Sequence, residues 1–283
     1  MSRKQKTAAA RIAVLYIPLF IVLALVLIPF LWAVSTSFKT IPEFQSETLH
    51  YLPQSLNFDN YSYVWGKSGF STYFVNSVIV SSLSVVVVIL LCICNAYALS
   101  RYKFRGKSGM TLLLLGTQMM PVILYLVPLF SVFKTIKLID SPAALVIFNI
   151  ILQTPFNTLL MRSFVNGVPK ELDEAAEIDG ATDFQIFTRI MLPAIRPILI
   201  VIFLFSFTGA WNDFLWPTLV FNDINKMPVT AGLQLLSNQM GQYNQMGSLM
   251  AATCMAIIPT LLLFLFAQKY FLQSLNITSG LKG

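Results

Sequence analysis

The chain has 283 residues, of which 56% are hydrophobic and 11% are charged, and its formal net charge is +7. A soluble domain usually has about 25% charged residues, so this composition excludes a disordered chain, a nucleic-acid-binding domain and an ordinary cytosolic enzyme. Its three cysteines all fall in apolar runs and its one histidine is His50, a set too small for a disulfide framework or a Cys/His metal site. The composition predicts an all-α, polytopic membrane protein.

Six apolar stretches lie between the charged residues, and we expect each to form one membrane-spanning helix. Such a helix needs about 20 apolar residues. In chain order the stretches are 12–37, 73–99, 110–133, 141–161, 197–221 and 249–267. Asp213 interrupts the fifth stretch roughly 24 Å along a helix from its start, near the expected outer boundary. There we expect Trp211 and Trp216 to anchor the membrane interface.

The basic residues predict the orientation. Fourteen of the 19 Lys and Arg residues lie in the N-terminal segment, the second loop, the fourth loop and the C-terminal tail, and five lie in the other loops. Because loops rich in Lys and Arg stay in the cytoplasm, we expect both termini inside. The N-terminus also resembles a secretory signal, but its apolar stretch exceeds the ~7–15 residues of a signal's apolar core, which favours an uncleaved first span.

Amide side chains inside or beside the spans are candidates for a substrate path. Unpartnered amides are costly at membrane depth, so each needs a reason to be there. The candidates are Gln118, Asn149, Gln153 and Asn212. Two interpretations stay open: the amides hydrogen-bond between helices and stabilise the bundle, or they line a polar path through it. A proton relay through Asp213 is disfavoured, because no other span offers a partner carboxylate.

The loop 162–196, expected in the cytoplasm, holds six of the twelve acidic residues and predicts two short helices. Pro169 suits the first position of the first helix, with acidic residues close to the positive end of its dipole. Gly180 would end that helix in a left-handed cap. Thr182 and Gln185 have the spacing of a capping box that opens the second helix.

Each predicted helix of this loop has its own face. The face of the first is mostly small, formed by Leu172, Ala175, Ala176 and Asp179. The face of the second is larger and apolar, suited to the underside of the bundle, and is formed by Phe184, Phe187, Ile190 and Met191. Pro193 and Pro197 are then expected to break the chain before the fifth span. Acidic residues around a small face predict docking onto a basic cleft of a cytoplasmic partner.

The same loop carries a family resemblance. Three residues separate Glu174-Ala175-Ala176 from Gly180, and nine residues separate Gly180 from Ile190-Met191-Leu192-Pro193. This spacing resembles the EAA loop of ABC importer permeases. Trp211–Phe214 and the terminal Gly280–Gly283 are similar to the carbohydrate-uptake branch, the second permease of maltose-type and multiple-sugar systems. The resemblance covers nearly the whole chain and implies six spans in a type I ABC importer permease fold.

The resemblance also implies site residues and a domain organisation. Residues implied to couple to an ATPase are Glu174, Ala175, Ala176, Asp179, Gly180, Ile190, Leu192 and Pro193. The segment 222–247, with Gly232, Gly241 and Gly247, is implied to reach into a binding protein, although a solvated linker would look similar. The expected divisions are an N-terminal tail, first helix and outer loop (1–72), a transmembrane core (73–267) and a cytoplasmic tail (268–283).

A set of partners follows from the resemblance. It implies a second homologous permease, an ATPase dimer that binds ATP and Mg²⁺, an extracytoplasmic solute-binding protein, membrane lipid and a small-molecule sugar, with no cofactor in this chain and no nucleic acid. The expected location is the bacterial cytoplasmic membrane. Polyamines, amino acids or phosphorylated compounds are alternative solutes.

Two other classes of protein fit less well. A stand-alone secondary carrier needs coupling-ion ligands or inverted repeats, which we do not find in the sequence. An intramembrane enzyme needs a catalytic set, which is also missing. Gly66-Lys67-Ser68 and Gly106-Lys107-Ser108 imitate the end of a phosphate-binding loop but lack its earlier glycine.

Overall fold

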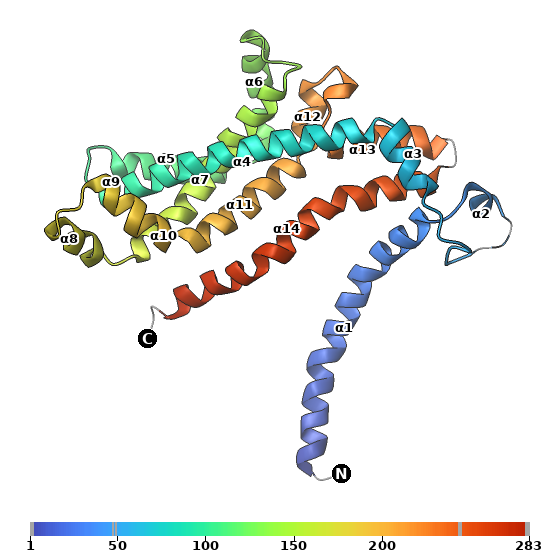
Figure 1. Ribbon diagram of the computed structural model, residues 1–283, viewed down its shortest axis with the longest axis horizontal. Coiled ribbons are helices and arrows are strands. Elements are labelled where there is room, and N and C mark those ends of the chain that lie inside the picture. Colours follow the sequence, from blue (N-terminus) through green and yellow to red (C-terminus); the bar gives the residue numbers. More distant parts are fainter. Residues whose placement is uncertain (1–2, 47, 49, 243–244, 281–283) are drawn as a thin grey trace. The chain divides into compact units, whose positions relative to one another are not determined.

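The computed structural model describes residues 3–46, 48, 50–242 and 245–280, and in these ranges the ordered elements are helices, without strands (Figure 1). The helices of eight or more residues are α1 (Arg3–Ser37), α3 (Asp59–Lys67), α4 (Phe70–Arg101), α5 (Lys107–Met119), α6 (Val122–Thr135), α7 (Pro142–Gly167), α8 (Glu171–Ile178), α11 (Arg196–Trp211), α13 (Val229–Gln242) and α14 (Met246–Gly280). The shorter ones are α2 (Ile41–Gln45), α9 (Asp183–Ile186), a π-helix (Phe187–Met191), α10 (Leu192–Ala194), α12 (Leu215–Val220) and a 3₁₀ turn (Ile224–Lys226).

Among the described residues, five helical segments are long and apolar enough to cross a membrane. They are Val14–Ser37, Phe70–Arg101, Pro142–Gly167, Arg196–Val220 and Met246–Lys269. These coincide with five of the six predicted spans. The fifth segment is interrupted between α11 and α12 at Asn212–Phe214, where the sequence predicts the interruption.

The prediction of one continuous helix at 110–133 is wrong. Two helices, α5 and α6, occupy this stretch and are bent by 105° relative to each other, so they count as a sixth span only if the bent pair is one span. The reason is Pro121, which has no N–H and disfavours the helical conformation at the residue before it. Met120 is accordingly extended, with φ −91° and ψ 125°.

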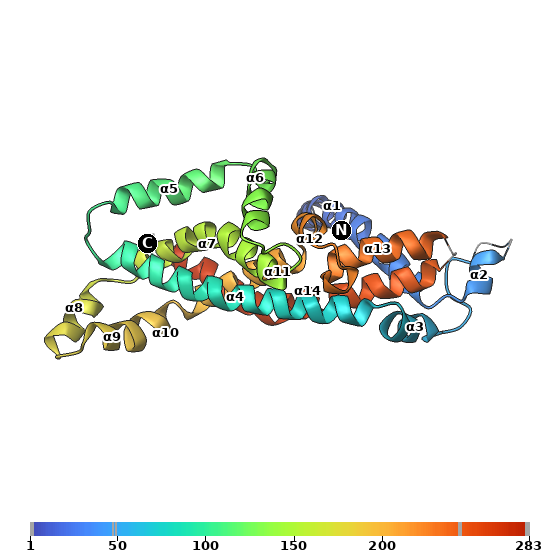
Figure 2. The same cartoon turned by 90° about the horizontal axis from the view of Figure 1, so that it is seen from above.

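The chain divides into two compact units, 1–71 with 233–257 and 72–232 with 258–283. In the second unit α4, α7 and α11 pack together with the π-helix. Their shared core is formed by Ile93, Ala96, Met161, Val165, Met191, Ile195, Ile198, Val201 and Ile202. In both Figure 1 and Figure 2, α8, α9 and α10 lie near the end of α4 where the chain turns toward α5.

Trp211 and Trp216 are interior residues of this unit, so their predicted role as interfacial anchors is wrong. Both side chains are buried, at 1% and 0% exposure. Trp216 stacks on Phe148 with ring centroids 4.4 Å apart, and its Nε1 donates to the Ala144 carbonyl at 3.3 Å. These neighbours come from another helix, α7, and a hydropathy pattern does not identify them.

In the first unit, Asn60 ties the end of α1 to the start of α14. Its Nδ2 donates to the carbonyls of Ser37 and Lys39 at 2.9 and 2.8 Å, and its Oδ1 accepts from Ser248 Oγ at 2.9 Å. Gly247 lies against the same amide, because a Cβ there would be 2.7 Å from Asn60 Nδ2. The apolar part of α1 has no such tie: none of its most apolar window is buried.

Candidate functional site

In the acidic loop 162–196 the first residues continue α7 as far as Gly167, and the first separate helix is α8, whose ends are set by local interactions. Lys170 is the N-cap and Glu171 the first helical residue, so Pro169 precedes the helix instead of opening it. Gly180 has a φ of +81°, which confirms the predicted left-handed cap. The capping box is confirmed too, since Gln185 N donates to Thr182 Oγ1 at 3.4 Å and Thr182 N donates to Gln185 Oε1 at 2.9 Å.

The second part of the loop is one helical run through α9, the π-helix and α10, and the break predicted at Pro193 and Pro197 lies between these two prolines, at Ile195. Leu192 N bonds to the Phe187 carbonyl, five residues back, which widens the helix by one residue. Pro193 follows this wide turn as the second residue of α10, where its missing N–H is tolerated. The run ends at Ile195, and Pro197 lies in the first turn of α11.

The π-turn also changes which side chains face the bundle. Ile186 and Met191 are buried, at 3% and 0% exposure, whereas Phe184 is 74% exposed and does not belong to the packed face as predicted. Phe187 packs against the shared core. Ile186 and Met191 are five residues apart, and the wide π-turn puts both on the same buried face. The ordinary period of about 3.6 residues, which the sequence prediction assumed, does not place them on one face.

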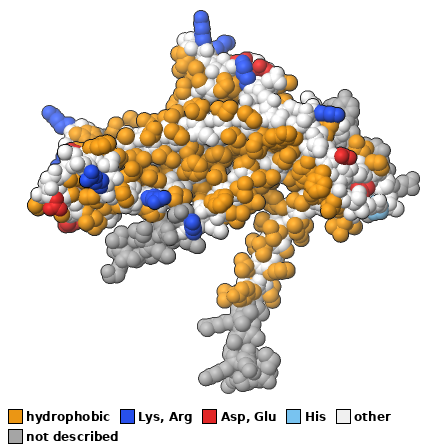
Figure 3. Space-filling model, viewed as in Figure 1, with side chains coloured by type: hydrophobic (Ala, Val, Ile, Leu, Met, Phe, Trp, Pro, Cys, Tyr) orange, Lys and Arg blue, Asp and Glu red, His pale blue; other side chains and the backbone are white. Residues whose placement is uncertain are grey.

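The predicted docking face of α8 is open. No residue of α8 is buried, Leu172 is 49% exposed, and Ala175 and Asp179 are exposed as well. Figure 3 shows acidic side chains gathered at the α8 end of the second unit. Small residues with carboxylates around them give a face that another protein can approach closely.

Sequence reasoning missed the residues that hold this loop to α4. Arg101, the last residue of α4, forms an ion pair with Asp173, with 2.6 Å between Nε and Oδ2 and side-chain exposures of 8% and 13%. Its Nη2 also donates to the Val168 carbonyl at 3.0 Å. The sequence shows Arg101 only as one of several basic residues in its loop, and nothing in it indicates a partner on α8.

A second contact lies one residue further along. Tyr102 Oη donates to Asp183 Oδ2 at 3.2 Å, and desolvation together with the Asp183 charge raises the pKa of Tyr102, which keeps the phenol protonated as a donor. Between the two contacts is a pocket of about 370 Å³. Its lining is Tyr97, Arg101, Tyr102, Lys170, Asp173, Glu174, Glu177, Asp183 and Ile186.

The four candidate path residues separate into two groups. Asn149 and Gln153 lie one turn apart on α7, and Gln153 Nε2 donates to Asn149 Oδ1 at 2.9 Å. Asn157, one turn further, donates to the Gln153 carbonyl at 3.0 Å and to Ser206 Oγ of α11 at 3.1 Å. The side chains of the other two candidates, Gln118 on α5 and Asn212 after α11, are exposed.

The predicted binding-protein segment is largely helical, through the 3₁₀ turn and α13. Gly232 packs against Tyr73, because a Cβ at this glycine would be 2.2 Å from the ring. Gly247 is the packing glycine beside Asn60. Gly241 lies within α13, but its surroundings are outside the described side chains. Two of the three glycines therefore have a structural reason within the protein.

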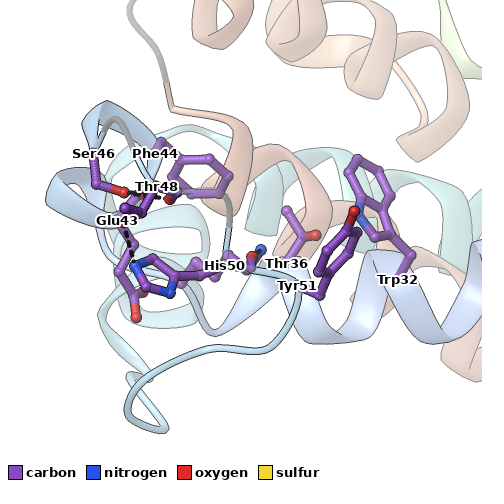
Figure 4. A pocket seen from close by; sticks show the side chains of 9 residues that line it. Trp32, Thr36, Glu43, Phe44, Ser46, Thr48, His50 and Tyr51 are labelled. Carbon is purple, nitrogen blue, oxygen red and sulfur yellow. Dashed lines mark hydrogen bonds between the residues drawn. The ribbon is translucent and has the colours of Figure 1, made fainter.

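A separate pocket of about 240 Å³ lies in the first unit and is lined by Trp32, Thr36, Lys39, Glu43, Phe44, Ser46, Thr48, His50 and Tyr51 (Figure 4). Its charged side chains, Glu43 and Lys39, form hydrogen bonds with backbone groups of the same loop. The amides of Thr40 and Gln54 each donate to the Glu43 carboxylate at 2.7 Å, and these bonds lower the pKa of that carboxyl despite partial desolvation. Lys39 Nζ donates to the His50 carbonyl.

Apolar helices long enough to span a membrane, joined by an acidic helical loop with an open face, define a multi-pass membrane protein. The family model described as the binding-protein-dependent transport system inner membrane component matches residues 93–277, so the chain belongs to that family. The resemblance predicted from the EAA spacing is thereby confirmed at the level of the family. The chain is a multi-pass permease subunit, not an enzyme.

Several relatives match over most of their length. The arabinooligosaccharides transport system permease protein AraQ of Halalkalibacterium halodurans is 33% identical over 99% of this chain and 100% of its own. The probable ABC transporter permease protein YurM of Bacillus subtilis is 34% identical over 93% of this chain and 85% of its own. The diacetylchitobiose uptake system permease protein NgcG of Streptomyces coelicolor is 32% identical, covering 89% and 83%.

A solved structure confirms the fold. A chain of a bacterial ABC transporter involved in the import of the acidic polysaccharide alginate superposes with a TM-score of 0.81, at 24% identity, over 96% of this chain and 99% of that one. A second structure, of a bacterial alginate ABC transporter in complex with an alginate pentasaccharide-bound periplasmic protein, has a TM-score of 0.69 at 19% identity, covering 92% and 94%. The fold is that of a type I ABC importer permease.

Proposed function

We propose that this permease imports a sugar or oligosaccharide across the bacterial cytoplasmic membrane as one half of a two-permease pathway. The observation that carries the proposal is the match, over most of their length, to relatives named for arabinooligosaccharides and diacetylchitobiose. The sparse intramembrane charge favours a neutral solute over a polyamine, an amino acid or a phosphorylated compound. ATP and Mg²⁺ belong to the separate ATPase partners, and the solute is delivered by an extracytoplasmic binding protein.

The proposed orientation puts both termini and the acidic loop in the cytoplasm. The excess of Lys and Arg in those segments supports it, fourteen against five. The proposed divisions are the N-terminal region 1–72, the transmembrane core 73–267 and the tail 268–283. The family match begins within α4 and extends into α14, which supports a core of this extent.

In this proposal α8 docks into a groove of an ATPase subunit, and closure of the ATPase dimer moves the loop. The residues assigned to this contact are Glu174, Ala175, Ala176, Asp179, Gly180, Ile190, Leu192 and Pro193. Their support is the resemblance of the loop to the EAA pattern, together with the open face of α8. Gly180 allows the sharp turn after the docking helix.

The solute path is proposed along Gln118, Asn149, Gln153 and Asn212. Gln153 has the strongest claim, because its Oε1 is buried without a hydrogen-bond partner although its Nε2 is bonded. Most buried side-chain polar atoms have a hydrogen-bond partner, so this free oxygen is available to accept a hydrogen bond from a solute. Contact of the binding protein with Gly232, Gly241 and Gly247 has weaker support, since two of these glycines are needed for packing.

The test is Glu174→Lys in the complete transporter, with Glu171→Lys on the same helix as a matched charge change. We expect Glu174→Lys to reach the membrane normally but to reduce solute uptake at least tenfold, because the variant presents a positive charge to a basic groove. Glu171→Lys should keep most of the uptake. Uptake of labelled mono- and oligosaccharides in a deletion strain measures both variants and identifies the solute.

Four results would contradict the proposal. Unchanged uptake in Glu174→Lys would remove Glu174 from the docking contact, and equal losses in both variants would assign the effect to loop charge in general. Continued uptake after deletion of the ATPase genes would favour a secondary carrier, and robust ATP hydrolysis by the purified chain alone would also count against a permease.

A further inference from the structure

The way in which α8 is attached to the bundle is unusual. A helix that must transmit force needs a firm connection to the spans, yet α8 has no buried residue with which to pack. The loop continues along the chain into α11 through the buried side chains of Met191 and Ile195. The π-helix packs on α4 through apolar and aromatic side chains, including Phe187 against Tyr97 with ring centroids 5.0 Å apart. The contact of α8 itself with α4 is polar and is centred on Arg101.

The Arg101 contact joins three segments at one side chain. The guanidinium, on the last residue of α4, forms the ion pair with Asp173 of α8. It also donates a hydrogen bond to the carbonyl of Val168, between α7 and α8, so its position is fixed by two contacts. Both charged side chains are nearly buried. Removing either partner would leave an uncompensated buried charge, so the contact holds more firmly than an exposed ion pair.

The pair also has unused bonding capacity. Arg101 Nε and Nη1 and Asp173 Oδ1 are buried and have no hydrogen-bond partner, so the 2.6 Å approach of Nε to Oδ2 is a charge contact without hydrogen-bond geometry. A guanidinium and a carboxylate can form two parallel hydrogen bonds, so a small shift of α8 would convert this single contact into a paired one.

We infer that Arg101 is a positioning residue that makes α4 move together with α8, through the buried Arg101–Asp173 ion pair. The inference rests on the proposed function, because it supplies the mechanical step between ATPase docking and the spans. The exposed Tyr102–Asp183 hydrogen bond is an auxiliary contact of the same kind, directed to α9. Through this ion pair the acidic loop transmits its motion to α4, in addition to α11, which follows the loop directly in the chain.

The first experiment measures coupling in the complete transporter. Arg101→Gln and Asp173→Asn should each assemble and hydrolyse ATP, but transport at least tenfold less solute per ATP hydrolysed. The double variant Arg101→Asp with Asp173→Arg should recover a substantial part of that ratio, because it restores the pair with reversed charges. Arg105→Gln, an exposed arginine of the same loop, is the control and should leave the ratio unchanged.

The second experiment separates coupling from folding. Spin labels at Ile178→Cys on α8 and Leu83→Cys on α4, both at exposed positions, report the distance between the helices after the native cysteines are replaced. In the transporter with Arg101 intact we expect ATP to leave this distance unchanged, and in Arg101→Gln we expect ATP to change it. An equal response of the distance to ATP in both proteins would overturn the inference. So would an unaltered amount of solute transported per ATP in the single variants. Failure of the charge-reversed double variant to recover that amount would also overturn it.

The two proposals fail in different ways. Absence of uptake by the unaltered transporter for every sugar in the panel would refute the proposed solute class. The distance measurement needs ATP but no solute, so it still decides whether α4 follows α8.

Discussion

Gly232 shows how a single residue is constrained by a neighbour distant in the sequence. A Cβ at this position would be 2.2 Å from the ring of Tyr73, a separation that real Cβ atoms do not reach. The glycine therefore allows the backbone at residue 232 to lie directly against Tyr73, independently of any partner protein.

We expect Gly232→Ala to lower the free energy of unfolding by about 1–3 kcal/mol, the usual cost of overpacking a well-packed site. Gly116→Ala is the matched control, because Gly116 lies in α5 with nothing within 4 Å of its would-be Cβ. Alanine there should stabilise the helix by up to about 1 kcal/mol. Thermal unfolding of the purified variants in detergent measures both, and equal stabilities would show that the Tyr73 ring moves aside freely.

At the scale of residues, what could be predicted depended on the range of the interaction. The Gly180 cap and the Thr182–Gln185 box were predictable because each is settled within a few residues. Burial of Trp211 and Trp216, and the pairing of Arg101 with Asp173, depend on helices brought together by the fold. A composition pattern cannot tell a tryptophan at a lipid interface from one stacked inside a bundle.

At the scale of elements, the turn between α6 and α7 is tied to the segment before α13. Lys226 Nζ donates to both the carbonyl and Oδ2 of Asp140 at 3.0 Å, and Asp140 Oδ1 accepts the amide of Asp223 at 3.2 Å. The Asp223 carboxylate also faces Lys226, at 4.0 Å. Asp140 has a φ of +62°, a conformation that needs such support in a non-glycine residue.

This contact should make stability depend on pH. The Lys226 hydrogen bond, and next the Asp223 amide, hold the pKa of Asp140 below its ordinary value of 3.8. A folded-state pKa below the unfolded value means that the stabilisation is present above pH 3.8 and is lost as the pH falls through the lowered pKa. Asp140→Asn should therefore unfold at lower temperature than the unaltered protein at pH 7, and the difference should vanish in acid.

The unfolding temperature of both proteins between neutral and acidic pH measures this effect. Asp59→Asn, at the exposed start of α3, is the control for removal of a surface carboxylate. A difference between Asp140→Asn and the unaltered protein that stays constant down to the most acid pH would contradict the assignment to this carboxyl.

Most of the helices were predictable as elements, but their bends were not. The apolar stretches located the five spanning helices because length and composition suffice for that. Whether a proline breaks a helix depends on its surroundings: Pro121 separates α5 from α6, while Pro128 lies inside α6 and Pro193 follows the π-turn. The freed carbonyl groups find partners only in the folded bundle, so sequence alone does not discriminate among these prolines.

At the scale of the whole molecule, the spans differ in how much of their surface the chain itself covers. In α4, α7 and α11 the most apolar window is 39% buried, whereas none of the corresponding window of α1 is buried. The first unit therefore leaves the apolar side of α1 open to cover from outside that unit, such as lipid or another subunit. The sequence cannot distinguish these coverings, because lipid tails are as apolar as the side chains of a partner helix.

Two leucines on spanning helices, one buried by the chain and one exposed, test how much each helix depends on contacts within the chain. Leu145 on α7 is 1% exposed and Leu25 on α1 is 72% exposed. We expect Leu145→Ala to lower the free energy of unfolding of the isolated chain by about 2–5 kcal/mol, because it leaves a cavity. Leu25→Ala should change it by no more than about 0.5 kcal/mol, because no contact within the chain is lost.

The same pair, measured in the assembled transporter, distinguishes lipid from protein as the covering of α1. If a second permease covers Leu25, Leu25→Ala should weaken assembly, measured by co-purification of the two permeases, while the isolated chain keeps its unfolding temperature. If lipid covers it, both quantities should stay unchanged. A large loss of stability in the isolated Leu25→Ala chain would contradict both coverings, because it would mean that α1 packs against its own bundle.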